Sequence, residues 1–327
     1  MTRDSCPPQM LRRRLLGTAL AAVALPGSVR AAAYPDRALT IICPFVAGGP
    51  SDITARTIGE PLRAALKQAV LVDNVTGAGG LVATRKVLVA PADGYTLLLG
   101  ASYLVTAPSL YKNANFDAAR DFIPLSPPVE SPLVFVCGTQ SNLKTLIDGA
   151  KQTGKPLTVA SPGAGTLSHL GAEMLRLASS SPIVHVPYRG VGPALTDVIG
   201  GNADLMLDGV SSSLPHIRSG RLKALFVPDG QRNPLLPDTP TGAEVGYPTV
   251  KVRAWNAIFA RAGTPDDVVN LLTASITKLL AKPEVRGELT ARGLEPSKLT
   301  PSAFRSGLGA EAAHWNRVIH DARITIE

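Results

Sequence analysis

The feature that most constrains this chain is a repeated alternation of short apolar segments with amphipathic helical ones. Apolar runs of strand length, at 39–45 ("LTIICPF") and 96–102 ("TLLLGAS"), are separated by helical patterns such as that over 53–66. A strand, a helix and a further strand in this order are typical of a parallel sheet with helices on its faces. The first part of the chain therefore predicts an α/β domain with a parallel sheet.

The same alternation begins again after a proline-rich segment, 123–132, and a second proline-rich run at 233–248 leads to the strand "AWNAIFA". We interpret these two segments as crossings between two α/β lobes. Two lobes joined by two crossings form a cleft with a hinge, which can close around a small ligand. The predicted boundaries are 34–130 with 255–327 for lobe 1, and 131–254 for lobe 2.

The last part of the chain is expected to be helical. Thr264-Pro265 and Thr300-Pro301 each predict a helix N-cap followed by proline at the first helical position. An apolar stripe at helical spacing predicts a core-facing surface for the final helix. Its members are Phe304, Leu308, Trp315 and Ile319.

Residues 1–33 have the pattern of a secretory signal peptide and not of a folded segment. Three arginines, Arg12–Arg14, precede a short apolar run, and Ala31 and Ala33 fit a cleavage site. The arginines also resemble a twin-arginine signal, so Sec and Tat export both stay open. This segment holds five arginines and one aspartate, about half of the formal net charge of +8. The remaining excess suits an anionic ligand without requiring one.

Two cysteines, Cys43 and Cys137, belong to the predicted mature chain, each at the end of an expected strand. Secretion permits a disulfide between them, but we favour two buried free thiols. Aromatic residues make up 5% of the sequence, which argues against a stacking surface for nucleic acid.

The segment 44–56, "PFVAGGPSDITAR", follows the first strand and opens a helix. The first N–H groups of a helix lack intrahelical partners and carry partial positive charge, which favours an anion. Gly48 and Gly49 allow close approach to the backbone, and Ser51 or Asp52 can cap the helix. The alternative is an ordinary βα turn in which glycine only satisfies the backbone angles.

A second turn of the same character, "SPGAGTLSHL", follows a strand of the second lobe. His169 near it is either a ligand-facing donor or a cap-region residue. Asp208 ends another strand and either faces the cleft or caps the next turn. The groups that the second turn supplies are Ser161, Gly163, Gly165, Thr166 and Ser168.

Enzyme motifs are incomplete in this sequence. Neither glycine turn has the Lys-Ser or Lys-Thr of a phosphate-binding loop, and neither has the third spaced glycine of a dinucleotide site. The segment around Ser102 lacks the closing glycine of a nucleophile elbow. The five histidines have no ligand-like spacing. We therefore expect that the protein is not an enzyme and that it binds no cofactor or metal ion. The least favoured alternative is a hydrolase that uses Ser102 or Ser161 with His169.

Taken together, these segments resemble the Bug-type periplasmic solute receptors of tripartite tricarboxylate transporters. The resemblance runs through nearly the whole predicted mature chain. It is carried by "YPDRALTIICPFVAGGPSD", "ADGYTLLLG", "ASPGAGTLSHL", "HVPYRGVGPALTDVIGGNADLMLD" and "SSSLPHIRSGRLKAL".

The resemblance implies a two-lobed "Venus flytrap" fold, a periplasmic location and a monomer that binds a small organic carboxylate. The carboxylate would be held largely by backbone and water from two loops, Phe45 to Asp52 and Ser161 to His169, with Ser102 and Asp208 also in the cleft. The implied partners are membrane transporter subunits. A receptor that feeds a signalling kinase is the alternative that the sequence leaves open.

The chain departs from the family pattern at four places, one of which is the segment 226–234 ("FVPDGQRNP"). Val46 and Ala47 stand where two prolines usually precede the glycines, and Val75 replaces an expected arginine before "GAGG". Gly209 replaces a frequent asparagine after Asp208. We expect Val46 and Ala47 to affect the choice of ligand more than the fold.

Overall fold

The computed structural model describes residues 34–321, 323–324 and 326. The predicted signal peptide, 1–33, lies outside these residues. Pro35–Glu327 forms one compact unit. Within the described part of the chain, no helix combines the length and apolar character that a membrane crossing needs.

The first sheet, called sheet A, has the strand order β12-β5-β11-β3-β1-β2, with β4 also paired to β11. Strand β1 pairs in parallel with β2 and β3, whereas β11 runs antiparallel to β3, β4 and β5. Its strands are β1 (Leu39–Cys43), β2 (Val70–Asn74), β3 (Thr96–Ala101), β4 (Phe122–Pro124), β5 (Val129–Ser131), β11 (Ala254–Arg261) and β12 (Glu295–Pro296).

The second sheet, sheet B, has the order β10-β6-β9-β7-β8. Strand β7 is parallel to β8 and β9, and β6 is antiparallel to β9 and β10. Its strands are β6 (Leu133–Gly138), β7 (Leu157–Ser161), β8 (Ile183–Pro187), β9 (Leu205–Gly209) and β10 (Leu222–Phe226).

The expectation of parallel sheets is therefore only partly right, because both sheets are mixed. The chain crosses from Ser131 in sheet A to Leu133, which pairs with Gly209 at the carboxyl end of β9. It returns so that Asn256 pairs with Ala101 at the carboxyl end of β3. A strand that enters a sheet at the carboxyl ends of its parallel strands must run against them. The crossings thus impose the antiparallel strands.

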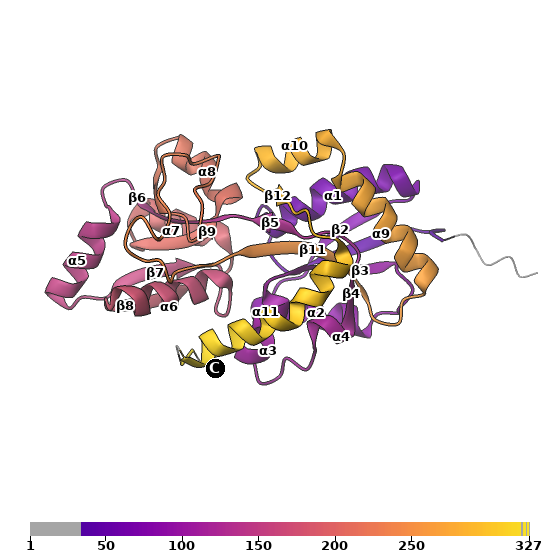
Figure 1. Ribbon diagram of the computed structural model, residues 1–327, viewed down its shortest axis with the longest axis horizontal. Coiled ribbons are helices and arrows are strands. Elements are labelled where there is room, and N and C mark those ends of the chain that lie inside the picture. Colours follow the sequence, from indigo (N-terminus) through magenta and orange to yellow (C-terminus); the bar gives the residue numbers. More distant parts are fainter. Residues whose placement is uncertain (1–33, 322, 325, 327) are drawn as a thin grey trace, which may run out of the picture. The chain divides into compact units, whose positions relative to one another are not determined.

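Helices cover both faces of each sheet (Figure 1). We call each sheet with its helices lobe 1 (sheet A) and lobe 2 (sheet B); the predicted domain boundaries themselves stay a prediction. Lobe 1 has α1 (Pro50–Leu66), η1 (Ala78–Gly80), α2 (Leu81–Val89), α3 (Tyr103–Leu110), α4 (Ala118–Asp121), α9 (Asp266–Leu280), α10 (Pro283–Ala291) and α11 (Pro301–Asp321), and lobe 2 has α5 (Leu143–Thr153), α6 (Leu167–Ser179), α7 (Val191–Gly200) and α8 (Val210–Arg218).

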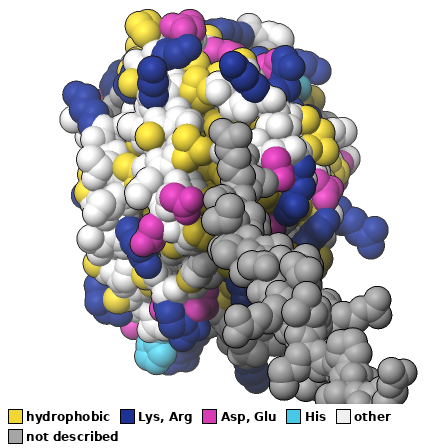
Figure 2. Space-filling view, turned by 90° about the vertical axis from the view of Figure 1, so that its right-hand side faces the viewer, with side chains coloured by type: hydrophobic (Ala, Val, Ile, Leu, Met, Phe, Trp, Pro, Cys, Tyr) yellow, Lys and Arg dark blue, Asp and Glu magenta, His cyan; other side chains and the backbone are white. Residues whose placement is uncertain are grey.

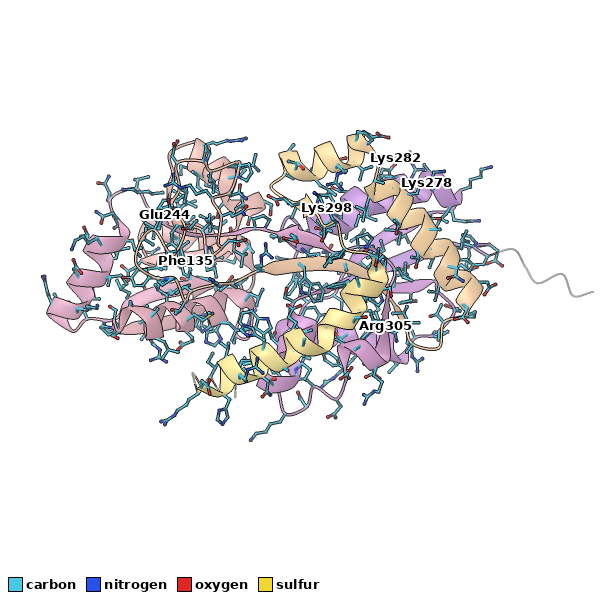
Figure 3. All side chains as sticks on the ribbon, viewed as in Figure 1. Phe135, Glu244, Lys278, Lys282, Lys298 and Arg305 are labelled. Carbon is cyan, nitrogen blue, oxygen red and sulfur yellow. The ribbon has the colours of Figure 1, made fainter. Side chains whose placement is uncertain are left out.

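Alternate residues of sheet B face two different hydrophobic clusters. Val134 and Val136 of β6 join the cluster that contains residues of α7 and α8, whereas Phe135 faces the cluster with residues of α5 and α6. Phe135 is labelled in Figure 3. Its ring stacks on that of Phe226, with the ring centroids 4.5 Å apart. The second cluster continues into lobe 1, where it includes Phe259. Alternation of this kind is what a strand buried on both faces requires.

The predicted stripe of α11 is confirmed, because all four of its apolar residues are buried. Of the two Thr-Pro caps, that at Thr300 is confirmed: its Oγ1 accepts from Ala303 N at 3.1 Å. The cap at Thr264 is wrong, since its hydroxyl donates to Arg261 O and α9 begins after Pro265.

Cys43 and Cys137 are both free and buried, as favoured from the sequence. Burial raises the pKa of each thiol to about 11, so both are protonated at neutral pH. On the face shown in Figure 2, outside its grey atoms, basic and acidic side chains are interspersed. The excess of basic residues is therefore not gathered into one large patch on that face.

Candidate functional site

The predicted binding loops lie at the carboxyl ends of the parallel strands. The turn 44–49 follows β1 and opens α1, and Ser102 follows β3. In lobe 2 the turn 162–166 follows β7 and opens α6, and Asp208 lies near the end of β9. Because the crossings enter each sheet at these same ends, both sets of turns adjoin the crossings. Carboxyl ends of this kind are the usual ligand-binding edge of α/β sheets.

Asp52 holds the first turn together. Its carboxylate, almost fully buried, accepts hydrogen bonds from Gly48 N, Arg56 Nε and Asn74 Nδ2, each at 3.0 Å. Burial alone would raise the pKa of Asp52, but these hydrogen bonds outweigh it and hold the pKa below its ordinary value. Asn74 also donates to Phe45 O at 2.8 Å. Asp52 therefore shapes the turn and is already saturated by protein partners.

The backbone of the first turn carries the free N–H groups of the start of α1. Gly48 has φ +85°, a conformation that favours glycine, and Gly49 is the N-cap of α1. Pro50 is the first helical residue and has no N–H, so the amides of Ser51 and Asp52 are the first donors that the helix offers. The Phe45 ring packs edge-on against Tyr103, with centroids 5.8 Å apart.

The second turn is held by its own hydroxyls. Ser161 Oγ donates to Gly163 O at 2.9 Å, and Thr166 Oγ1 donates to the same oxygen at 2.8 Å. Gly163 and Gly165 have φ of +151° and +78°, which favours glycine at both positions. Because the Ser161 and Thr166 hydroxyls both bond to Gly163 O, the turn is held without any charged group.

Two histidines stack beneath this turn. The rings of His169 on α6 and His185 on β8 lie 3.7 Å apart at 14°. Gly165 N donates to His169 Nδ1 at 3.2 Å, and His185 Nε2 lies 2.5 Å from Ser161 Oγ. Burial and the neighbouring His169 lower the pKa of His185 to about 4, and burial also lowers the pKa of His169. Both rings are therefore neutral at neutral pH.

The hydrolase alternative paired Ser161 with His169, but the structure places His185 beside Ser161 instead. The Ser161 hydroxyl has one proton, and either Gly163 O or His185 Nε2 can accept it, depending on the tautomer of His185. The pair of Ser161 with His169 that the hydrolase alternative requires is not formed.

Ser51 and Ser102 are buried, and their hydroxyls bond to the hinge strand β11. Ser51 Oγ donates to Asn256 Oδ1 at 2.7 Å, and Ser102 Oγ accepts from Trp255 N at 3.1 Å. Asp208 is buried too: it accepts from Ser212 Oγ at 2.6 Å and Ser213 Oγ at 2.7 Å. Complete burial raises the pKa of Asp208, and the two hydroxyls partly offset this rise.

Two glycines of lobe 2 lie against the first predicted loop of lobe 1. A Cβ at Gly190 would lie 2.7 Å from Val46 Cγ2, and one at Gly209 would lie 2.7 Å from Pro50 Cγ. On the other side of the site, Tyr111 Oη donates to Ala164 O at 2.9 Å. The first turn thus contacts lobe 2 beside α7 and α8, and the second turn contacts lobe 1.

Several of these groups were not among the predicted site residues. The turn 77–80 and Gly190 could have been found from the sequence. Each places a glycine immediately before a helix, as the first predicted loop does. A Cβ at Gly79 would lie 3.4 Å from Ala164 O, so this turn adjoins the second turn. His185 and Asn256 carried no such signal, because only strand pairing brings them to the loops.

Residues 54–324 match the family model described as the tripartite tricarboxylate transporter family receptor. The chain belongs to this family. The UPF0065 protein in the tcbD-tcbE intergenic region of Pseudomonas sp. (strain P51) is 35% identical over 334 residues, which cover 99% of each chain. Protein BugT of Bordetella pertussis is 33% identical and covers 94% of this chain and 96% of its own. The resemblance to Bug-type receptors is thereby confirmed.

Solved structures of this receptor family have the same two-lobed fold. The periplasmic binding protein BugD is 34% identical with a TM-score of 0.84, over 90% of this chain and 100% of that one. MatC from Rhodopseudomonas palustris, with bound malate, is 30% identical with a TM-score of 0.81, over 88% and 100%. Rpa4515 of R. palustris, with adipate, is 30% identical with a TM-score of 0.84, over 89% and 99%. These neighbours are solute-binding proteins.

Most of the hydroxyls and both imidazoles around the two turns already have protein partners, so the backbone amides at the two helix starts are the main donors left to a ligand. Arg56, a cation in the first turns of α1, is bound to Asp52. In the described parts of the chain, no group of three or more His, Cys, Asp or Glu side chains is arranged to hold a metal ion. Such a site suits recognition of an anion by hydrogen bonds.

Proposed function

We propose that the mature chain is an extracytoplasmic receptor that binds a small organic carboxylate between its lobes and delivers it to a tripartite tricarboxylate-type transporter. One observation carries this proposal. Two glycine turns, each opening a helix, lie on different lobes and each contacts the opposite lobe, at Gly190 for the first turn and Tyr111 for the second. A ligand held by both turns would join the lobes.

A carboxylate is the ligand class that these groups favour. Helix N-termini attract negative charge, and amide donors bind carboxylate oxygens without needing a cation. We expect the Ser51 and Asp52 amides to bind one carboxylate. The second turn would bind a second carboxylate or a hydroxyl. The similar proteins MatC and Rpa4515 were solved with malate and adipate, both dicarboxylates, which agrees with two anion-binding turns.

The receptor is proposed to act in the periplasm as a monomer. The signal-peptide pattern of 1–33 and the periplasmic homologues support this location. Transporter subunits are the proposed partners because the matched family is named for that role.

Thermal unfolding of the mature protein tests the proposal. Malate, adipate, citrate and a panel of monocarboxylates are added separately, with the matching alcohols as uncharged controls. A ligand that binds only the folded state stabilises it by about 2.7 kcal/mol at a concentration one hundred times its Kd. At least one carboxylate should raise Tm by several degrees while its alcohol does not. A full panel without any shift would refute carboxylate binding.

A further inference from the structure

Asn256 joins three segments of the chain through one buried amide. The residue lies on β11 and is 3% exposed. Its Oδ1 accepts from Ser51 Oγ at 2.7 Å, and its Nδ2 donates to Ser131 Oγ at 2.8 Å. Both ends of the amide are therefore bonded within the protein, and one of the two Nδ2 protons is used in the bond to Ser131.

The segments that Asn256 joins have different roles. Ser51 is the second residue of α1, and only Pro50 separates it from the Gly48–Gly49 turn. Ser131 ends β5 at the first crossing and pairs with Ala254, where the return crossing enters sheet A. One side chain thus links the first glycine turn to both connections between the lobes.

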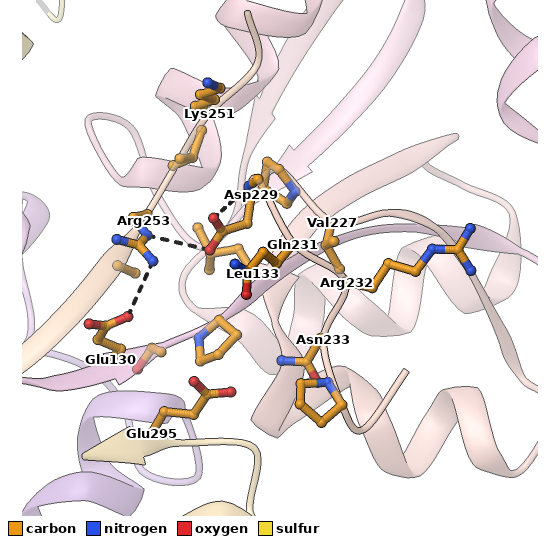
Figure 4. A pocket seen from close by; sticks show the side chains of 17 residues that line it. Glu130, Leu133, Val227, Asp229, Gln231, Arg232, Asn233, Lys251, Arg253 and Glu295 are labelled. Atoms are coloured by element: carbon orange, nitrogen blue, oxygen red, sulfur yellow. Dashed lines mark hydrogen bonds and ion pairs between the residues drawn. The ribbon is translucent and has the colours of Figure 1, made fainter. Parts of the chain in front are cut away.

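The ion pairs at the crossings are weak. Arg253 lies 3.8 Å from Glu130 and 3.4 Å from Asp229, beside a cavity of about 590 Å³ (Figure 4). Its side chain is 70% exposed, so water and salt screen these ion pairs. A buried amide that loses a partner is instead left desolvated and unpaired. The buried bonds of Asn256, and that of Ser102 to Trp255 N, should therefore resist rotation of the crossings more than the ion pairs do, and of these only Asn256 reaches the helix start at the first glycine turn.

We propose that Asn256 is a positioning residue that couples carboxylate capture at the first glycine turn to rotation of the two crossings. It acts through Ser51: a ligand on the amides of α1 fixes the helix start, and Asn256 transmits this constraint to Ser131 and β11. The inference rests on the proposed receptor function, since it assumes that the ligand binds the first turn.

The test compares the mature protein with its Asn256→Ala variant. Nitroxide spin labels are attached at Lys151→Cys on α5 and at Lys278→Cys on α9, both exposed positions. Pulsed electron paramagnetic resonance then measures the distance between the lobes. Cys43 and Cys137 are buried and stay unlabelled. The probe is whichever of malate, adipate and citrate stabilises the parent most. We expect Asn256→Ala to broaden the ligand-free distance distribution, to reduce the ligand-induced change, and to raise the dissociation rate about tenfold.

Ser126→Ala is the matched control. Ser126 Oγ accepts from Ile258 N at 3.0 Å, so its loss removes a buried bond to the same strand without touching the glycine turn. The control should keep the parent's distances and keep its dissociation rate within about twofold. If Asn256→Ala does not fold, Ser131→Ala, which loses a single bond of the network, takes its place.

An Asn256→Ala protein with the parent's distances and dissociation rate overturns the inference, even if its Tm is lower, because that result assigns Asn256 a structural role only. If none of the three probes stabilises the parent, the proposed function is in question and not the coupling. The ligand-free distances then decide the coupling alone: a broader distribution in Asn256→Ala supports it, and an unchanged one refutes it.

Discussion

Gly49 and Gly190, two glycines of one site, differ in what the fold requires of them. Gly49 has φ −81°, and a Cβ added to it would find its nearest neighbour, Val46 O, at 3.7 Å. Gly190 has φ +115°, and its Cβ would lie 2.7 Å from Val46 Cγ2. The fold itself requires glycine at Gly190. At Gly49 it does not, so the proposed access of a ligand to the backbone can be tested there with a small substitution.

Gly49→Ala should therefore fold normally and bind the carboxylate at least tenfold more weakly, because the methyl group occupies the space of the ligand. Calorimetric titration measures the affinity, and thermal unfolding measures the stability. Gly149→Ala, in α5 with no atom within 4 Å of its Cβ, is the control. It should raise stability by about 0.5–1 kcal/mol without changing affinity. Equal affinities for Gly49→Ala and the parent would argue against contact with this turn.

His185 predicts a dependence of stability on pH. Its pKa is about 4 in the folded protein and about 6.5 when unfolded. Between these values the unfolded state binds more protons, so stability falls as pH is lowered from 7 towards 4. His185 alone should cost about 1 kcal/mol between pH 7.5 and 5.5. His169 adds in the same direction.

Urea unfolding at pH 7.5 and 5.5 measures this loss in the parent and in His185→Gln. The variant should lose less stability on acidification, because glutamine does not titrate. His169 stays in the variant and Glu173 lies near it, so part of the pH dependence persists. Identical losses in both proteins would mean that His185 does not titrate as described.

At the scale of elements, α1 begins where Asp52 can tie three segments together. The helix starts at Pro50, three residues before the start expected at Ile53. Its N-cap, Gly49, has no side chain, and the helix start has no side-chain cap hydrogen bond; the carboxylate of Asp52 reaches back to Gly48 N, before the helix. The sequence indicated Asp52 as a cap or a ligand contact, and in the structure its carboxylate holds the preceding turn.

Asp52→Asn should destabilise the protein by about 1–3 kcal/mol at pH 7, because it removes the charge that Arg56 and the Gly48 amide share. The pKa of Asp52 is lowered in the folded state, so its contribution is present above its unfolded pKa and is lost as pH falls through the folded value. The difference between variant and parent should thus shrink towards pH 3. Glu60→Gln, at an exposed ion pair of the same helix, should change little.

At the scale of the whole molecule, the lobes contact each other at individual polar groups and through one shared hydrophobic cluster. Tyr111 Oη bonds to Ala164 O across the lobes at 2.9 Å, while Tyr103 Oη lies 2.8 Å from Thr84 Oγ1 within lobe 1. A contact that exists only when the lobes meet should affect their opening more than it affects folding.

Tyr111→Phe should shift the population towards open forms and weaken carboxylate binding by about fivefold, since one hydrogen bond contributes roughly 1 kcal/mol. Small-angle scattering without ligand reports the opening, and titration reports the affinity. Tyr103→Phe removes a hydroxyl of similar strength inside lobe 1. It should lower Tm without opening the lobes. The same opening in both variants would show that the Tyr111 bond has no special role.

Much of the fold could be predicted because strands and helices depend on local patterns. The strands at β1 and β3 were expected within two residues of their bounds. Parallel sheets were predicted, whereas both sheets are mixed. No local pattern indicates that β11 and β6 enter their sheets at the carboxyl ends of the neighbouring strands. The short α8 after Gly209 was not expected either, and its serines bond Asp208.

The sequence by itself determined where the glycine turns lie, that each opens a helix, and that the final helix buries one stripe. These depend on backbone conformation and spacing, which neighbouring residues set. Only the tertiary structure decided which hydroxyls already have protein partners. Ser51 bonds Asn256, 205 residues away, and Ser161 lies against His185 instead of His169. Such partners are chosen by strand pairing, and a hydrogen bond needs two groups brought within about 3 Å, which no local pattern specifies.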